Sequence, residues 1–247
     1  MKRIVLCSAE SVYTDAVLQQ LSADPKVKIV GLVSSTRVLK KGENTLASKA
    51  RLLQRVGVGY GMYLLRITTA VGPLGRVFQT MRRWAWHLEC VIVETGDVNS
   101  AEMVDWLNAR EADVIVCAHF NQIISSNTIE AVKAEFLNIH PGHLPNYRGL
   151  DPMFFALLRG ETEVGVTFHR IDAGIDTGDV LGQASMEVQE RSLTDCNMEA
   201  FRRGSALLCD YLAGRPTERR DMAGSESYDS WPTPADVRMF ISKGNRF

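Results

Sequence analysis

The chain has 247 residues, of which 45% are apolar and 23% are charged. This balance is that of a soluble globular protein with one large domain, or one domain and a small appendage, and it excludes disordered, collagen-like and disulfide-scaffold chains. The net charge of −1 does not favour any particular class of binding partner. Five scattered cysteines without a CxxC pair argue against a zinc site and favour a reducing, cytoplasmic compartment. The apolar run at the N-terminus is too short for a signal peptide.

Short apolar runs alternate with amphipathic segments through the first 140 residues. Strands are expected over residues 2–8, 28–34, 90–94, 113–118 and 136–139, and helices over residues 11–21, 102–109 and 125–132. This alternation predicts an α/β fold with a Rossmann-like, mostly parallel twisted sheet and helices on both faces. The first turn, residues 8–12, contains no glycine, so we do not expect it to bind the pyrophosphate of NAD.

Residues 37–89 form an insert that interrupts this alternation, with a helical part expected around residues 40–88. The insert holds ten Lys or Arg and two Glu, a net of +8, whereas the rest of the chain holds 18 against 27, a net of −9. A basic segment on an acidic body indicates an anionic partner, and a solvated helical face explains it equally well. Gly57, Gly59 and Gly61 follow a basic helix-like stretch rather than a strand, so we do not expect them to bind phosphate.

Within the insert, residues 56–75 have only one charged residue, Arg66. The length suits a membrane span, but five glycines, Pro73 and the central arginine argue against one. Basic residues and two tryptophans, Trp84 and Trp86, follow, so peripheral membrane contact through residues 56–86 is one interpretation. We favour the alternative of two helices packed on the domain, with a homodimer interface as a further option.

Asn138 and His140 are the first candidate catalytic residues. Strand alternation places both side chains on one side of the strand that ends there, before Pro141, Gly142 and Pro145 force an irregular loop. An asparagine amide can donate to a developing oxyanion, and a histidine can exchange a proton near neutral pH. A carboxylate is needed to orient the histidine, and the loop over residues 172–179 offers three, Asp172, Asp176 and Asp179. Asp176 lies between Gly174 and Gly178, in a stretch flexible enough to fold back over a neighbouring strand end.

Two motifs, NIHPGHLPNYRG and DAGIDTGD, resemble the signature of the folate-dependent formyltransferases. That family includes methionyl-tRNA formyltransferase, glycinamide ribonucleotide transformylase and the sugar-nucleotide N-formyltransferases. The resemblance covers residues 113–182 closely and the N-terminal region in outline. It implies a fold of the formyltransferase type. It further implies an enzyme of one-carbon metabolism, with Asn138, His140 and Asp176 as catalytic residues and no metal.

The resemblance also implies 10-formyltetrahydrofolate as formyl donor and an amine as acceptor. The folate pocket would be formed by two stretches of the chain, residues 116–123 and 172–178. Its expected residues are Val116, Ala118, Phe120, Ile123, Ala173, Gly174 and Ile175. An amine would attack the formyl carbon, Asn138 and protonated His140 would hold the oxyanion, and Asp176 would orient His140 or a proton-carrying water.

Departures from the family pattern bear on the acceptor. Gly142 and His143 replace the commoner Ser-Leu, so His143 either contacts acceptor phosphate or lies at the surface. Arg148 could clamp an anionic group, with Gly149 beside it, or form a structural ion pair. About 65 residues follow Gly182, too few for the tRNA-binding domain of methionyl-tRNA formyltransferase, which disfavours nucleic acid. The first turn also lacks the phosphate loop of glycinamide ribonucleotide transformylase.

These departures favour a small, phosphate-bearing amine such as an amino-sugar nucleotide. A lipid-linked or secondary-metabolite amine at a membrane surface, methionyl-tRNA, and a non-catalytic folate- or nucleotide-binding relative remain alternatives. Residues 1–190 are expected to form the catalytic domain, with the insert as the place where acceptor specificity lies. Residues 191–247 are expected to add a helix, over residues 194–212, and a polar tail to the same domain.

Overall fold

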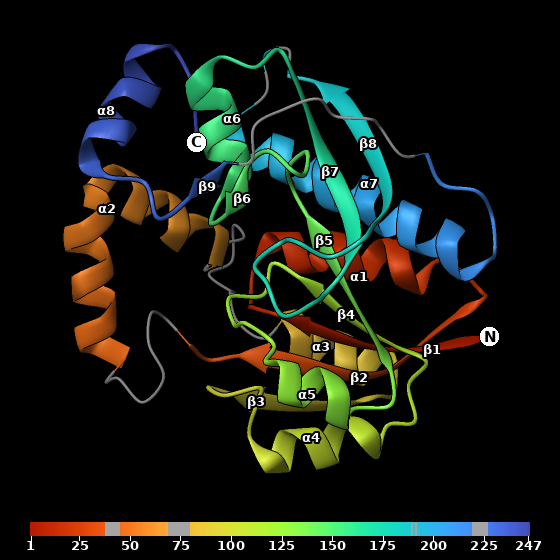
Figure 1. Ribbon diagram of the computed structural model, residues 1–247. Helices are drawn as coiled ribbons and strands as arrows, with labels where there is room; N and C mark the ends of the chain where they lie inside the picture. The colour runs from red at the N-terminus through yellow and green to blue at the C-terminus, as the bar shows by residue number, and fades with distance from the viewer. Residues whose placement is uncertain (38–44, 69–79, 189, 191, 219–226) are drawn as a thin grey trace.

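The fold was analysed in a computed structural model, which describes residues 1–37, 45–68, 80–188, 190, 192–218 and 227–247. Its centre is a seven-stranded sheet in the order β3-β2-β1-β4-β5-β7-β8 (Figure 1). The strands are β1 (Lys2–Ser8), β2 (Val27–Ser35), β3 (Val91–Thr95), β4 (Val114–Ala118), β5 (Glu135–His140), β7 (Glu163–Arg170) and β8 (Val180–Glu187). The first five are parallel to one another, and β7 and β8 are antiparallel to their neighbours.

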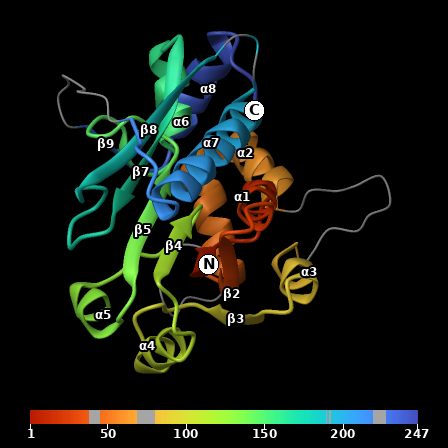
Figure 2. The same cartoon turned by 90° about the vertical axis from the view of Figure 1, so that its right-hand side faces the viewer.

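Helices cover both faces of the sheet, which confirms the expected fold class (Figure 2). They are α1 (Val12–Ser22), α2 (Thr45–Thr68), α3 (Thr80–His87), α4 (Ala101–Asn108), α5 (Ser126–Ala131), α6 (Pro152–Arg159), α7 (Leu193–Leu212) and α8 (Pro234–Ser242). The larger core joins the sheet to α1 and α7, and the smaller core joins its other face to α4 and the segment around α5. Side-chain caps begin several helices, such as Ser11 at α1 and Ser192 at α7.

The insert contributes two described helices. α2 bends at Gly57, where φ is 79°, and it packs on the body through buried Val56, Tyr60, Tyr63 and Ile67. None of the described helices is both long and apolar enough to cross a bilayer. The described part of residues 56–75 is therefore a packed helix, and residues 69–75 lie outside the described residues.

The C-terminal region contains more structure than the expected helix and polar tail. α8 lies beside α2 (Figure 1), and the ring of Phe240 stacks on those of Phe154 and Phe247. Before α8, strand β9 (Tyr228–Asp229) pairs with β6 (Arg148–Gly149) in a separate two-stranded parallel sheet. These two residue pairs connect the end of the chain to the loop that follows His140.

Candidate active site

Asn138 and His140 lie at the carboxyl end of β5, on one side of the strand as expected. Strand β7 runs antiparallel to β5 and places His169 opposite Asn138 and Thr167 opposite His140. Opposed residues of an antiparallel pair point to the same face, so four polar side chains gather there. Three of these residues, His140, Thr167 and His169, are buried. The site is therefore a mostly buried polar patch on two inner strands, at the carboxyl end of β5.

Both ring nitrogens of His140 face oxygen atoms. Nε2 lies 2.8 Å from the carbonyl oxygen of Tyr147, which can only accept, so Nε2 carries a hydrogen. Nδ1 lies 3.6 Å from Oδ2 of Asp176. Nδ1 can therefore take up a proton and present it toward a carboxylate, which stabilises the charged ring.

Asp176 folds back from the loop between β7 and β8, as the sequence analysis expected. Its Oδ2 accepts a hydrogen bond of 2.9 Å from the backbone N–H of Gly149. The loop is braced by Asp172, whose Oδ1 accepts from the N–H of Gly174 at 3.0 Å and from the hydroxyl of Thr177 at 2.6 Å. A Cβ atom on Gly174 would lie 2.0 Å from Oγ1 of Thr177, so this turn requires glycine.

His169 is a site residue that the sequence analysis missed. Its Nδ1 donates to the carbonyl oxygen of Arg170 at 2.7 Å, which leaves Nε2 to accept from the amide Nδ2 of Asn138 at 3.0 Å. Burial, and next the neighbouring His140, lower the pKa of His169 to about 4, so the ring is neutral at neutral pH. His169 thereby fixes which way the amide of Asn138 points.

The arrangement suits acyl chemistry. One N–H of Asn138 is used by His169. Among the residues that the structure describes no partner takes the second N–H, which can donate to a developing oxyanion. His140 stands two residues along the same strand with Asp176 behind its Nδ1. Among the described residues no group of three His, Cys, Asp or Glu side chains is placed to hold a metal ion.

The expected folate-pocket residues fall into two groups. Val116 and Ala118 are fully buried in the core against α1 and α7, and strand alternation turns them away from the face that carries Asn138. Phe120 is partly buried, Ile123 and Ile175 are 61% and 41% exposed, and Ala173 and Gly174 are exposed. The second group lies on the two loops that leave β4 and β7.

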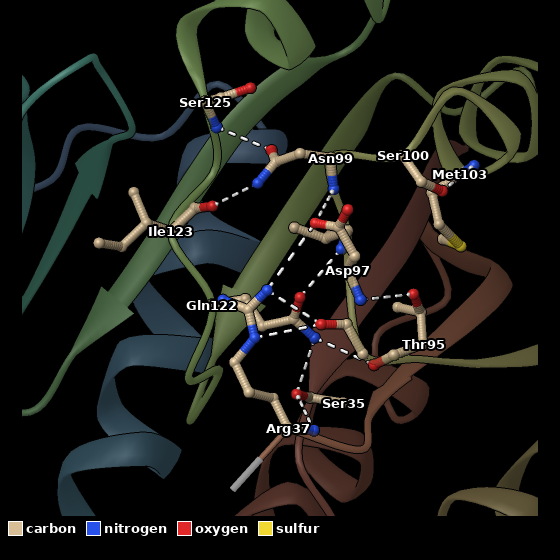
Figure 3. Close-up of polar contacts among 12 residues, drawn as sticks. Ser35, Arg37, Thr95, Asp97, Asn99, Ser100, Met103, Gln122, Ile123 and Ser125 are labelled. Carbon is tan, nitrogen blue, oxygen red and sulfur yellow. Dashed lines mark hydrogen bonds and ion pairs between the residues drawn. The ribbon is translucent and has the colours of Figure 1, made fainter. Parts of the chain in front are cut away.

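A network of amide side chains holds the loop after β4 (Figure 3). Gln122 donates through Nε2 to Ser35 Oγ at 2.8 Å and to the Thr95 carbonyl at 3.0 Å, and its Oε1 accepts from the N–H of Val98 at 2.9 Å. Asn99 donates to the carbonyl of Ile123 at 2.9 Å and accepts from the N–H of Ser125 at 2.8 Å. The loop is thus tied to the carboxyl ends of β2 and β3.

The expected acceptor-contacting residues do not form one surface. His143 is buried, with its Nε2 3.1 Å from the hydroxyl of Ser185, and a Cβ atom on Gly165 would lie 1.7 Å from it. His143 is therefore not a surface residue. Arg148 and Gly149 form β6, and the N–H of Gly149 is used by Asp176.

Comparisons with known proteins point in one direction. A sequence model of the formyl transferase family matches residues 1–204. Methionyl-tRNA formyltransferase of Chloroflexus aggregans is 38% identical over 125 residues, which are 49% of this chain and 40% of that protein. Its counterpart in Listeria welshimeri is 28% identical over 191 residues, which are 74% of this chain and 60% of that protein. The chain thus aligns with less than two thirds of the length of these relatives.

Solved structures share the fold at low sequence identity. Glycinamide ribonucleotide transformylase 1 from Symbiobacterium toebii has a TM-score of 0.58 and 18% identity, covering 87% of this chain and 89% of that one. The N-formyltransferase from Helicobacter canadensis, in complex with folinic acid and dTDP-3-aminofucose, has a TM-score of 0.57 and 15% identity, covering 93% and 71%. Such identities establish the likeness of the fold alone.

Proposed function

The chain belongs to the formyl transferase family, and we propose that it transfers a formyl group from 10-formyltetrahydrofolate to the amine of a small acceptor. The observation that carries this proposal is the convergence of an amide, an imidazole and a carboxylate from two distant stretches of chain. The bound donor would supply an activated one-carbon acyl group next to these side chains.

Each residue has one task in this proposal. Asn138 donates its second amide hydrogen to the formyl oxygen as negative charge develops there. His140 accepts and returns a proton through Nδ1, while Asp176 stabilises the charged ring. The Nε2 hydrogen of His140 is used by the Tyr147 carbonyl, so Asn138 rather than His140 is the oxyanion donor, unlike the expectation from the sequence. Tyr147 keeps the imidazole in one orientation through its carbonyl oxygen. His169 stays neutral and keeps the amide of Asn138 oriented.

The proposed place for the donor is between the two loops that carry Ile123 and Ile175. Ile123 and Ile175 are large apolar side chains that are 61% and 41% exposed. Exposed apolar side chains on two loops suit the flat face of a pterin-like ring. The loop that carries Ile123 is rigid because Gln122 and Asn99 use both ends of their amides to hold it. Val116 and Ala118 would contribute by backing this loop from the core.

For the acceptor we favour an amino-sugar nucleotide. A solved structure of the same fold was determined with dTDP-3-aminofucose, and another, a sugar 3N-formyl transferase, with dTDP. The basic insert of this chain and Arg148 would suit the diphosphate of such a molecule. The relatives that act on methionyl-tRNA keep transfer RNA as a competing acceptor.

A donor-consumption assay tests the proposal. 10-Formyltetrahydrofolate is incubated with the full chain and, in separate reactions, dTDP-amino sugars, UDP-amino sugars, glycinamide ribonucleotide and methionyl-tRNA. We expect turnover with an amino-sugar nucleotide and at least 100-fold less with an Asn138→Ala variant, in line with the loss of about 3–4 kcal/mol for one oxyanion donor. Turnover with methionyl-tRNA alone would overturn the acceptor. No donor consumption and no donor binding in any reaction would overturn the activity.

One surface feature favours a second acceptor class, an amine on a lipid. Val58, Met62 and Leu65 are 70%, 58% and 52% exposed and follow one another at helical spacing on the outer side of α2. α2 carries four basic and no acidic residues. Flotation with anionic vesicles at low salt tests this candidate, with a variant in which the three apolar residues are changed to Ser as control. A wild-type chain that stays in the soluble fraction excludes it.

A further inference from the structure

The loop that follows His140 holds both members of the His140–Asp176 pair. The Tyr147 carbonyl accepts from Nε2 of His140 at 2.8 Å, and the Gly149 N–H donates to Oδ2 of Asp176 at 2.9 Å. We call residues 147–150 the strap. Tyr147 orients the imidazole of His140, and Gly149, two residues later, orients the carboxylate of Asp176. The position of the strap therefore sets the geometry of the His140–Asp176 pair.

The strap has an unusual backbone. Tyr147 and Gly149 have φ angles of 57° and 102°, and Asp151, the residue that follows the strap, has 47°. Left-handed backbone at a non-glycine residue costs about 1 to 3 kcal/mol and persists only where the surroundings enforce it. The strap therefore needs partners that hold it in place.

The Tyr147 side chain is held by Glu161, which accepts from its hydroxyl at 2.6 Å, and by Arg159, whose guanidinium lies over its ring. Most of the partners of the strap backbone come from the C-terminal part of the chain. The N–H of Tyr147 donates to the hydroxyl of Ser227 at 2.8 Å, and the N–H of Arg148 donates to the Ser227 carbonyl at 2.9 Å. The N–H of Leu150 donates to the Asp229 carbonyl at 2.8 Å. Three of the four strap N–H groups thus end on residues 227–229, and the fourth ends on Asp176.

Residues 227–229 are themselves anchored to the body. Arg159, on α6, donates from both terminal nitrogens to the two carboxylate oxygens of Asp229, at 2.8 and 2.7 Å. Arg55, on α2, donates to the hydroxyl of Ser230 at 2.9 Å. A Cβ atom on Gly149 would lie 2.2 Å from the Asp229 carbonyl oxygen, so the two segments are in close contact.

We propose that residues 227–229 are a positioning element of the active site, with Asp229 as its anchor. They act through the strap and touch neither donor nor acceptor. The formyl transferase match ends at residue 204, so this element lies outside the matched part of the chain. The test by kcat rests on the proposed function, whereas the test by the ¹⁵N signals of His140 does not.

The first test is the Asp229→Asn variant, which keeps the shape of the side chain but replaces one carboxylate oxygen that Arg159 contacts. Displacement of the strap should lower kcat about 10- to 100-fold, the effect of a small misplacement of catalytic groups, while KM for donor and acceptor changes less than kcat. Asp210→Asn is the matched control, because Asp210 likewise accepts hydrogen bonds from an arginine, Arg215, but lies near the C-terminal end of α7. A loss of kcat no larger than that of the control overturns the proposal.

The second test measures the imidazole directly. The ¹⁵N signals of His140 in the full chain should move in Asp229→Asn and, by a smaller amount, in Ser227→Ala, and should stay in place in Asp210→Asn. Arg159→Met should move the His140 signals at least as far as Asp229→Asn, because it also removes the guanidinium that lies over the ring of Tyr147. The double variant should be no worse than Arg159→Met alone, because Asp229→Asn then has no ion pair left to remove. Unchanged His140 signals in all these variants overturn the proposal. If the wild-type chain consumes no donor, the proposed function fails and these signals alone decide.

Discussion

His169 Nε2 accepts a hydrogen bond of 3.0 Å from the amide of Asn138, across neighbouring antiparallel strands. We therefore predict that His169→Phe, which removes this acceptor, lowers kcat about 10-fold through loss of orientation. His169→Gln restores a carbonyl acceptor and should recover part of the loss. Steady-state kinetics on the three proteins checks this, and equal kcat values for the Phe variant and the wild type would contradict it.

The amide of Asn138 should contribute more than its orienting partner. Asn138→Ala removes the donor itself, so we expect kcat to fall about 100- to 1000-fold with little change in thermal stability. Asn108→Ala is the matched control. Asn108 bonds the Ala131 carbonyl and the Lys133 N–H, far from the carboxyl ends of the strands, so its removal should lower stability and leave kcat unchanged. Near-normal turnover in Asn138→Ala would refute the assignment.

Asp176 should act through charge as well as through shape. Asp176→Asn keeps an oxygen for the Gly149 N–H but removes the negative charge 3.6 Å from His140 Nδ1. We expect kcat to fall about 100-fold or more, because a protonated imidazole loses its counter-charge. The comparison with Asp172→Asn separates the two loop carboxylates, since Asp172 braces the turn without facing His140. A larger loss in Asp172→Asn would contradict the assignment.

Two partly buried groups should give the free energy of unfolding opposite dependences on pH. Burial lowers the pKa of His119 to about 4, so between about pH 6.5 and 4 the unfolded chain binds a proton that the folded chain does not, and stability is lost as pH falls. Burial raises the pKa of Asp151 to about 6. Between about pH 4 and 6 the folded chain therefore binds a proton that the unfolded chain does not, and the free energy of unfolding falls as pH rises.

The change His119→Asn tests the first of these contributions. Asparagine tolerates the left-handed backbone at this position, where φ is 51°. Urea unfolding at pH 6.5, 5.5 and 4.5 should show the free energy of unfolding of the variant falling less steeply than that of the wild type. Parallel curves for the two proteins would contradict the assignment of this pKa.

Local pattern was sufficient to predict where Asn138, His140 and the loop of Asp176 lie, while their catalytic roles stay predictions that the family resemblance implies. Strand alternation gives the shared face of the first two, and glycines around Asp176 indicate a loop that folds back. His169 could not be found in this way, because its role comes from the pairing of β7 with β5, which no local period encodes. The same limit applies to Val116. Strand alternation shows which residues of β4 share its face, but not that the site lies on the opposite face.

The expected polar tail shows a further limit of sequence patterns. Residues 227–229 are polar, and β9 is only two residues long, too short for a periodic signal. Their pairing with the strap depends on Arg159 and on the left-handed backbone at Gly149. The helix over residues 194–212, by contrast, was predicted almost to its ends, since α7 is long and amphipathic.

Two glycines inside helices should respond oppositely to the same change. In α7, a Cβ atom on Gly204 would lie 2.3 Å from Ile139 Cγ2 and 2.9 Å from Val166 Cγ2, so Gly204→Ala must push α7 away from β5, at a cost of about 1 to 3 kcal/mol. In α2, a Cβ atom on Gly59 would meet Val237 Cγ1 at 3.4 Å, so Gly59→Ala should gain up to about 1 kcal/mol of helix propensity. Urea unfolding of both variants gives the signs, and a stabilising Gly204→Ala would show that α7 does not pack on β5 this closely.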